Sequence, residues 1–260
     1  MSHGLRLVLQ GICHAYRNLS VVEDIDLLAE PGQVLVLVGP SGCGKSTLLG
    51  IMGGLIAPSG GTVRCEGAVA EDCLNPLTYV FQDFALLPWR SVAGNISLVL
   101  EDRLPRAERA ARVAEVLTLT GLADFADAWP RQLSGGMRQR VGIARALAVR
   151  PACLLMDEPL SALDAQTRDL LLDEFAGLIA RAGTTTVYVT HNLSEAARLG
   201  HQIAVLSRRP GRVRAVLRIE RPLAGRTAAD PDLLEIEGEL WRMIRDDAAA
   251  AERERLDADS

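Results

Sequence analysis

Aromatic residues, long apolar runs and basic charge are all scarce in this chain of 260 residues, and each scarcity excludes a class of protein. Phe, Trp and Tyr make up 4% of the sequence, which leaves little material for the stacking platforms that bind single-stranded nucleic acid. The formal net charge of −5 gives no basic excess for a phosphate backbone, so we expect no nucleic-acid partner. The longest apolar runs, such as residues 34–39, are far shorter than the ~20 residues of a membrane-spanning helix.

Paired cysteines and a leader segment are missing as well. The five cysteines form no Cys-x-x-Cys pair and are odd in number, so free thiols in a reducing compartment are the simplest interpretation. The first ten residues lack the apolar stretch of a secretory signal. We therefore expect a soluble, intracellular chain. With 48% apolar and 23% charged residues the composition is globular, and the length suits one large domain or one domain with an insertion.

Strand and helix patterns alternate along the sequence and predict an α/β fold. Residues 34–38 (VLVLV) form a continuous apolar run, typical of a parallel strand that is buried on both faces. Residues 84–150 change to an Ala-, Arg- and Leu-rich helical pattern, which predicts a helical insertion. We therefore expect a parallel core sheet with an antiparallel β layer beside it. The remaining elements expected are strands at 5–10, 25–28, 153–158, 184–190 and 213–219, and helices after residue 44 and at 167–181.

The C-terminal region is predicted to be an amphipathic helix. Leu233, Ile236, Leu240 and Ile244 recur at spacings of three and four residues, which places them on one helix face. Residues 248–260 (AAAAERERLDADS) are expected to be a solvated helix end or a disordered tail.

A glycine-rich loop follows the central strand and predicts nucleotide binding. Residues 39–46 (GPSGCGKS) match the pattern GxxxxGK[ST], in which the glycines let backbone N–H groups converge on phosphates. Lys45 is expected on the β- and γ-phosphates of ATP, and Ser46 as a hydroxyl ligand of Mg²⁺. The strand before and the helix after make a chance match the weaker alternative. Cys43 fills a free position of the loop as a small neutral residue, or alternatively as a redox switch.

An acidic pair follows a second apolar run, in LLMDEP at 154–159. P-loop enzymes need an acidic partner for Mg²⁺ at the end of a neighbouring strand, and Asp157 suits that role. Glu158 is the candidate general base that polarises the attacking water. The alternative is a surface Asp-Glu pair before a turn proline.

A second glycine-rich loop, LSGGMR at 133–138, opens an expected helix but contains no lysine. Taken with GPSGCGKST, Gln82 in VFQDF, LLMDEP, SALD at 161–164 and His191 in VYVTHN, it completes an ordered set of motifs. This set resembles the ATP-binding subunits of ABC transporters over residues 5–220, and each motif alone is much less specific. The resemblance implies an ABC ATPase domain at 1–225, with a helical subdomain at about 84–150 inserted in a RecA-like core, and a C-terminal helix and tail at 226–260.

The resemblance also implies roles for the remaining motif residues. Gln82 would contact Mg²⁺ and the attacking water, and His191 would hold the γ-phosphate. Asp164 would lie in a loop at the interface between two subunits, and Tyr16 would stack on adenine, with a packed strand-end tyrosine as its alternative. Ser134, Gly135 and Gly136 would cap the γ-phosphate of ATP bound to the other subunit of a homodimer, or of a pair with a related chain. The full set expected to contact ATP is Tyr16, Gly39, Pro40, Ser41, Gly42, Cys43, Gly44, Lys45, Ser46, Thr47, Gln82, Ser134, Gly135, Gly136 and Asp164.

Within the family the chain is similar to the nitrate, sulfonate and taurine importer branch, on LPWRSV at 87–92, MDEPLSALDAQTR at 156–168 and VLSRRPGRV at 205–213. Residues 83–100 would receive a transmembrane permease, with the alternative that Leu86, Leu87 and Trp89 form the core of the helical insertion. A periplasmic or extracellular solute-binding protein would act indirectly, and the chain would lie peripherally on the cytoplasmic face of the membrane. The sequence departs from the branch at 160–161 and 200–202. An exporter or lipid-trafficking ATPase, a soluble ABC switch protein and a P-loop kinase remain alternatives.

Overall fold

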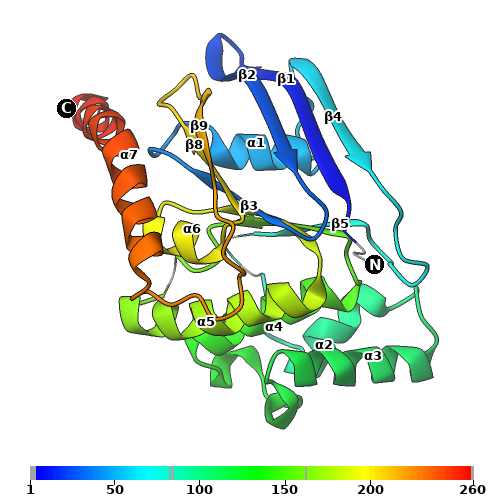
Figure 1. The fold of residues 1–260 in the computed structure, drawn as a ribbon. Helices are drawn as coiled ribbons and strands as arrows, with labels where there is room; N and C mark the ends of the chain where they lie inside the picture. The colour runs from blue at the N-terminus through cyan, green and yellow to red at the C-terminus, as the bar shows by residue number, and fades with distance from the viewer. Residues whose placement is uncertain (1–3, 82, 84, 162, 259–260) are drawn as a thin grey trace.

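Two β-sheets with a helix between them, and a layer of helices below, make up the molecule (Figure 1). The computed structural model describes residues 4–81, 83, 85–161 and 163–258. In that part of the chain no helix combines the length and apolarity needed to cross a membrane. The five cysteines, all among the described residues, are free thiols. The expected α/β architecture, with a parallel sheet and an antiparallel layer, is confirmed.

The larger sheet contains six strands in the order β5-β6-β7-β3-β8-β9, of which all but β9 run parallel. The central strand β3 is buried along its whole length, as its apolar run predicts. Its two faces meet two different cores, because Val34, Val36 and Val38 pack with one hydrophobic cluster and Leu35 and Leu37 with the other. The strands are β3 (Val34–Val38), β5 (Leu77–Val80), β6 (Cys153–Asp157), β7 (Thr185–Val189), β8 (Gln202–Leu206) and β9 (Val213–Arg218).

The smaller sheet is antiparallel, in the order β2-β1-β4. Its strands are β1 (Arg6–Tyr16), β2 (Leu19–Ala29) and β4 (Gly60–Glu66), so the strands expected at 5–10 and 25–28 are parts of longer ones. Helix α1 (Lys45–Met52) lies between the two sheets and buries Leu48 and Leu49 in their shared core. The patterns did not predict β4, β5 or β8. The side chains of β4 are mostly exposed, and β5 is four residues long, so neither carries a strong strand signal.

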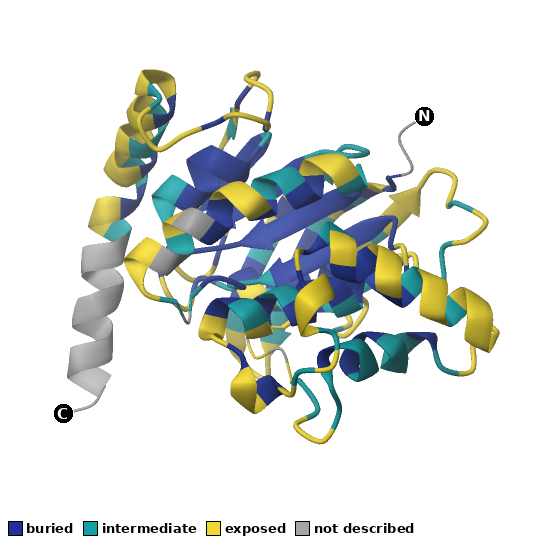
Figure 2. Ribbon diagram, turned by 90° about the horizontal axis from the view of Figure 1, so that it is seen from below, coloured by how far each residue is buried: buried dark blue, intermediate teal, exposed yellow. Residues whose placement is uncertain are grey.

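The other face of the large sheet is covered by helices, whose outward sides are exposed while the strands between them are buried (Figure 2). The insertion predicted at 84–150 is helical, as expected. Its elements are α2 (Val92–Ser97), η1 (Leu98–Leu100), α3 (Arg106–Leu119), η2 (Ala123–Phe125), η3 (Pro130–Gln132) and α4 (Gly135–Ala148). The remaining helices are α5 (Ala165–Ala182), α6 (Leu193–Leu199) and α7 (Pro231–Ala258).

A buried asparagine fixes the loop before α2. Asn95 has no exposed surface, and its side-chain amide donates to the carbonyls of Leu87, Arg90 and Ser91. Its carbonyl oxygen accepts from the backbone N–H of Leu87 at 2.8 Å. Because every polar atom of this side chain is used, the preceding loop is held in one shape and Trp89 is left 68% exposed. Trp89 is therefore not a core residue of the insertion, whereas Leu86 packs partly against the core.

The C-terminal helix packs as the sequence pattern predicts. Leu233, Leu240 and Ile244 are buried against the main core, and Ile236 is partly buried. The approach to α7 is fixed by Arg226, which is 4% exposed and donates to three carbonyls at the end of α6, including that of Gly200 at 2.6 Å. Burial lowers the pKa of Arg226 to about 10, with a smaller contribution from the charge of Arg221.

We expect Arg226→Leu to lower the free energy of unfolding by about 2–4 kcal/mol, because several buried carbonyls at the end of α6 lose their donor. Urea denaturation followed by circular dichroism measures the change. The matched control Arg218→Leu, at an exposed position of β9, should change stability by less than about 0.5 kcal/mol. Equal stability of the two variants would contradict this account of Arg226.

Candidate nucleotide-binding site

The glycine-rich loop lies between the end of β3 and the start of α1, which is the strand-loop-helix context expected for it. Gly44 precedes α1 with φ of +102°, and a Cβ at this position would stand 2.6 Å from Cγ1 of Val22. At Gly39 a Cβ would stand 2.8 Å from the carbonyl oxygen of Leu206. Glycine is therefore required at both ends of the loop, since strands β2 and β8 leave no room for a side chain there. The backbone N–H groups at the start of α1 have no acidic side chain in the first turn to satisfy them.

Lys45 is folded against the loop that it follows. Its ammonium donates to the carbonyl oxygens of Gly39 at 2.8 Å and Pro40 at 3.1 Å, and the residue is only 7% exposed. It is also the only lysine in the chain. Burial of a positive charge is tolerated only with polar partners, and here the partners are neutral carbonyls. The loop therefore holds a positive charge without an acidic partner among these hydrogen bonds, which suits the binding of an anion.

Cys43 of the same loop is buried, and its sulfur lies 3.9 Å from the Lys45 ammonium. Burial raises the pKa of the thiol, although the nearby Lys45 charge acts in the opposite direction. A buried thiol with a raised pKa is poor in thiolate and therefore unreactive. Of the two interpretations left open by the sequence, the structure favours the small neutral residue over a redox switch.

The first acidic residue of the pair faces the start of α1. The Ser46 hydroxyl donates to Oδ1 of Asp157 at 3.1 Å, and the Tyr79 hydroxyl lies 3.3 Å from Oδ2. Burial raises the pKa of Asp157, while the bonds from Ser46 and Tyr79 lower it. Burial and the nearby Asp157 likewise raise the pKa of Tyr79, which keeps its hydroxyl protonated and donating. No sequence pattern indicates a role for Tyr79, because only the pairing of β5 with β6 brings it beside Asp157.

The second acidic residue, Glu158, contacts residues at the end of β7 and directly after it. Oε2 of Glu158 lies 3.0 Å from Nδ1 of His191, and its backbone N–H donates to the carbonyl of Val189 at 3.0 Å. The backbone of Glu158 has φ of +45°, an unfavourable region for a residue with a side chain. Strained positions of this kind cluster at functional sites, where the surrounding contacts impose them.

A buried carboxylate behind His191 was not predicted. Glu195 of α6 is 3% exposed and accepts hydrogen bonds from Tyr188 at 2.9 Å and Thr190 at 2.8 Å. Burial raises its pKa, and these two bonds oppose the shift. Arg168 of α5 lies 3.5 Å away and also donates to the carbonyl of Leu163. The turn that carries His191 is therefore linked, through Glu195 and Arg168, to the segment that carries Asp164.

The second glycine-rich loop lies at the start of α4 in the helical insertion. The Ser134 hydroxyl caps the helix by accepting from the N–H of Met137 at 3.2 Å. Gly135 and Ser134 are exposed, and a Cβ on Gly135 would stand 3.4 Å from Leu163. Ser134, Gly135 and Gly136 thus offer backbone N–H groups and a hydroxyl at a helix N-terminus, next to Leu163, and carry no basic side chain themselves.

Comparison with known proteins decides the family. The family model described as "ABC transporter" matches residues 22–161 of this chain. The chain belongs to the ABC transporter family. The taurine import ATP-binding protein TauB of Pseudomonas putida is 41% identical over 249 residues, covering 95% of this chain and 91% of its own length. The aliphatic sulfonates import ATP-binding protein SsuB of Ralstonia nicotianae is 44% identical, covering 81% of this chain and 73% of its own.

A solved structure of the same type also aligns with this ABC family member. It is the dimeric post-hydrolysis state of the ATP-binding cassette MJ0796 bound to ADP and Pi, with a TM-score of 0.67 and 32% identity. The alignment covers 85% of this chain and 100% of that chain. The resemblance drawn from the ordered motifs, including the importer branch, is thereby confirmed together with the ABC ATPase fold.

The structure brings part of the expected ABC site together. Lys45, Ser46, Asp157, Glu158 and His191 lie at the carboxyl ends of the neighbouring strands β3, β6 and β7. Tyr16 ends β1, 49% exposed, with its ring against that of His14 at 4.7 Å, and Asp164 is exposed before α5. Gln82 lies outside the described residues. The individual role of each residue remains a prediction.

We expect Lys45→Ala to weaken ATP binding by at least about tenfold, because the only positive side chain of the loop is lost. Fluorescent nucleotide titration measures the affinity. The matched control Arg64→Ala, on the exposed strand β4, should bind ATP like the parent chain. An amine-reactive reagent offers a second readout, since Lys45 is the only lysine: ATP should protect it from labelling. Unchanged affinity and unprotected labelling would contradict the assignment.

Proposed function

We propose that this chain is the ATP-hydrolysing subunit of an ABC importer for a small solute such as taurine, another sulfonate or nitrate. The observation that carries the proposal is the adjacency of two polar pairs, Ser46 with Asp157 and Glu158 with His191, at the carboxyl ends of the neighbouring strands β3, β6 and β7. The choice of solute rests on the names of the relatives, which are import proteins for taurine, aliphatic sulfonates and nitrate.

Phosphate binding is assigned to residues 39–47. In a glycine-rich loop that opens a helix, backbone N–H groups of the loop and of the first helical turn bind phosphate, and the Lys45 ammonium adds a full positive charge beside them. Tyr16 at the end of β1 is assigned to the adenine ring, because it is an exposed aromatic held edge-on by His14. Binding of the nucleotide then exchanges the two carbonyl partners of Lys45 for phosphate oxygens.

The residues present also fit a magnesium ion. Ser46 and Asp157 already share a hydrogen bond, so a hydroxyl and a carboxylate oxygen lie within reach of one ion, and Mg²⁺ prefers such oxygen ligands. These two residues, with Gln82 as predicted from the sequence, would hold it. When bound, Mg²⁺ neutralises charge on the β- and γ-phosphates. Tyr79 orients the carboxylate through its hydrogen bond to the other oxygen.

Hydrolysis is assigned to Glu158 and His191. Glu158 takes the proton of the attacking water as general base, and its carboxylate is positioned by the contact with Nδ1 of His191. His191 shares a hydrogen bond with that carboxylate and orients it, along with the γ-phosphate. The buried Glu195 holds the turn before His191 through Thr190. The chain therefore supplies separate carboxylates for the metal and for the water.

The second glycine loop is assigned to the site of a partner chain. Ser134, Gly135 and Gly136 offer donors but no charge, so they suit a phosphate that is already neutralised elsewhere. We propose that two copies bind two ATP molecules head to tail, each copy capping the nucleotide of the other, with Asp164 at the interface. The dimeric state of the MJ0796 cassette supports this arrangement. Pairing with a related chain is the alternative.

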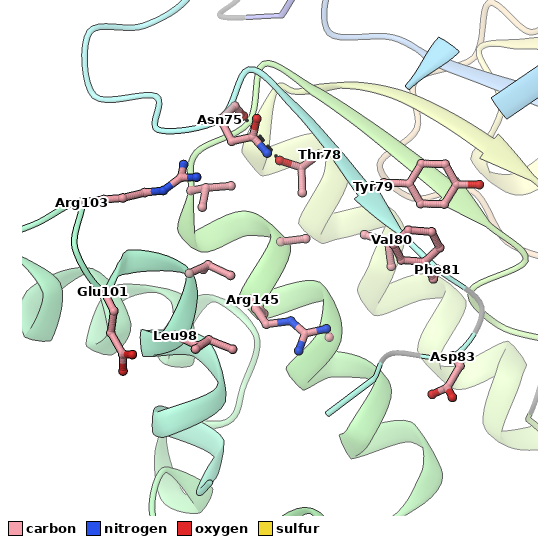
Figure 3. Close-up of a pocket in the computed structure, with 14 residues that line it drawn as sticks. Asn75, Thr78, Tyr79, Val80, Phe81, Asp83, Leu98, Glu101, Arg103 and Arg145 are labelled. Carbon is pink, nitrogen blue, oxygen red and sulfur yellow. Dashed lines mark hydrogen bonds between the residues drawn. The ribbon is translucent and has the colours of Figure 1, made fainter. Parts of the chain in front are cut away.

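The permease is assigned to a groove between β5 and the helical insertion. The groove has a volume of about 300 Å³; Figure 3 shows Tyr79, Val80 and Phe81 along one side, with Arg145 projecting beside it. Arg145 donates to the carbonyl of Ala85 and so ties α4 to the segment 83–91. Exposed Trp89 lies in that segment, within the predicted docking region 83–100. Contact with a permease places the chain on the cytoplasmic face of the membrane, and a solute-binding protein acts only through the permease.

We expect Glu158→Gln to bind ATP normally, to accumulate as an ATP-bound dimer and to hydrolyse ATP at least about 100-fold more slowly, because the amide cannot accept the proton of water. Phosphate release and size-exclusion chromatography with light scattering measure the two effects. The exposed Glu108→Gln in α3 is the matched control. Phosphate release near the parent rate would show that Glu158 is not the base.

We expect Trp89→Glu to lose most of its copurification with a transmembrane permease, because a charge replaces an exposed apolar side chain at the proposed contact. Pull-down from detergent-solubilised membranes with identification by mass spectrometry measures binding. The control Phe125→Glu changes another exposed aromatic of the same subdomain. ATP binding should be intact in both variants. Retention of the permease by Trp89→Glu would place the contact elsewhere.

A further inference from the structure

Helix α7 lies beside the phosphate loop and is firmly attached there. Its buried side packs on α6, the helix that directly follows His191 and Asn192. Arg214 of β9 donates to the carbonyl of Met243 at 2.7 Å and lies 3.3 Å from the Asp247 carboxylate. With the Arg226 contacts at its base, α7 is held to the body of the protein along its described turns. The side of α7 that does not pack on the protein, here called its free side, therefore points in a defined direction.

That free side faces the nucleotide site across a cavity. Leu234, Glu237, Gly238 and Trp241 follow one another at helical spacing, so they form one stripe of α7. The stripe lines a cavity of about 570 Å³ whose other wall consists of the phosphate loop at Gly39, Pro40 and Ser41, together with His191. Leu234 is 53% exposed and Trp241 57% exposed, so two large apolar side chains stand unburied beside the loop.

An exposed apolar stripe next to a functional surface indicates a partner, since such side chains gain free energy only when water is removed from them. The phosphate loop and His191 belong to the surface through which a second copy would close over ATP. The stripe is continuous with that surface, because the same cavity contains both. A second copy that reached the phosphate loop would therefore also meet α7.

Charge also fits a second copy. The segment 230–241, at the start of α7, contains five acidic residues and no basic residue. The segment 131–138, which a second copy would bring to the phosphate loop, contains Arg131 and Arg138 and no acidic residue. Opposite charges on two approaching surfaces speed their association and set its orientation.

We propose that the stripe of Leu234, Glu237, Gly238 and Trp241 is an additional part of the interface with a second copy of this chain, and that α7 thereby contributes to closure over ATP. This inference rests on the proposed function, because it requires the two copies to close on each other's nucleotide. The stripe contributes apolar contact to the interface, from residues outside the nucleotide-binding motifs.

The test uses the Glu158→Gln chain, in which the ATP-bound dimer accumulates. Leu234→Glu and Trp241→Ala, each added to this chain, should raise the dimer dissociation constant at least about fivefold, because each removes an apolar anchor. ATP affinity of the separate chains should stay within about twofold of the parent. The matched control is Leu55→Glu, since Leu55 is 61% exposed at the far end of α1. It should dimerise like the parent.

Trp241 fluorescence gives a second readout. Trp89→Phe and Trp129→Phe leave Trp241 as the only tryptophan of the three. In the Glu158→Gln chain its emission should shift to shorter wavelength on addition of ATP, and the shift should grow with protein concentration. A shift that is independent of concentration would mean that α7 closes on its own chain, which overturns the proposal.

Different results would contradict the inference about α7 and the proposed function. If the Glu158→Gln chain dimerises with ATP and the two α7 variants dimerise equally well, the inference about α7 is wrong and the proposed function stands. If the Glu158→Gln chain with native α7 binds ATP but stays monomeric, the proposed mode of action is wrong as well, and the inference falls with it.

Discussion

The parallel pairing of β6, β7 and β3 is the constraint on which the rest of the site depends. Val189 of β7 is the register partner of both Leu37 in β3 and Asp157 in β6. Because Leu37, Val189 and Asp157 are aligned across the three strands, the phosphate loop, the acidic pair and His191 all begin within a few residues of this aligned row. The backbone bond from Glu158 to Val189 extends the row by one residue. A shift in either register would separate the proposed metal ligand Asp157 from the loop and the proposed base Glu158 from His191, even if every motif were intact.

The site also depends on how its buried charges are balanced. Lys45 and Asp157 are both partly or wholly removed from water, yet they do not pair with each other in hydrogen bonds. Lys45 uses two loop carbonyls, whereas Asp157 uses the hydroxyls of Ser46 and Tyr79. A direct ion pair would neutralise the charge that binds phosphate. Neutral partners stabilise each charge without cancelling it, so the site remains able to attract an anion on one side and a cation on the other.

Much of this arrangement could be predicted from the sequence, because its parts are local patterns. The phosphate loop and the acidic pair each follow a buried apolar run, and parallel strands carry such residues to one edge. Tyr79 and Glu195 could not be predicted. Tyr79 reaches Asp157 only because β5 is the neighbour of β6, and Glu195 reaches Thr190 only because α6 turns back behind β7. The same holds for α7, since its amphipathic pattern predicts a buried face but not which surface the opposite face meets.

The contrast between the two glycine-rich loops supports the proposal that two copies act together. The first contains the only lysine of the chain, while Ser134, Gly135 and Gly136 of the second offer only N–H groups and a hydroxyl. Residues without charge bind a phosphate weakly unless other groups already balance the charge of that phosphate. Under the proposed function the second loop therefore acts after the first. Because the two loops lie on different subdomains, ATP held by one copy is the most direct bridge to the other. Under the proposed function, association depends on the intact nucleotide, and loss of the γ-phosphate removes the bridge while leaving each subunit folded.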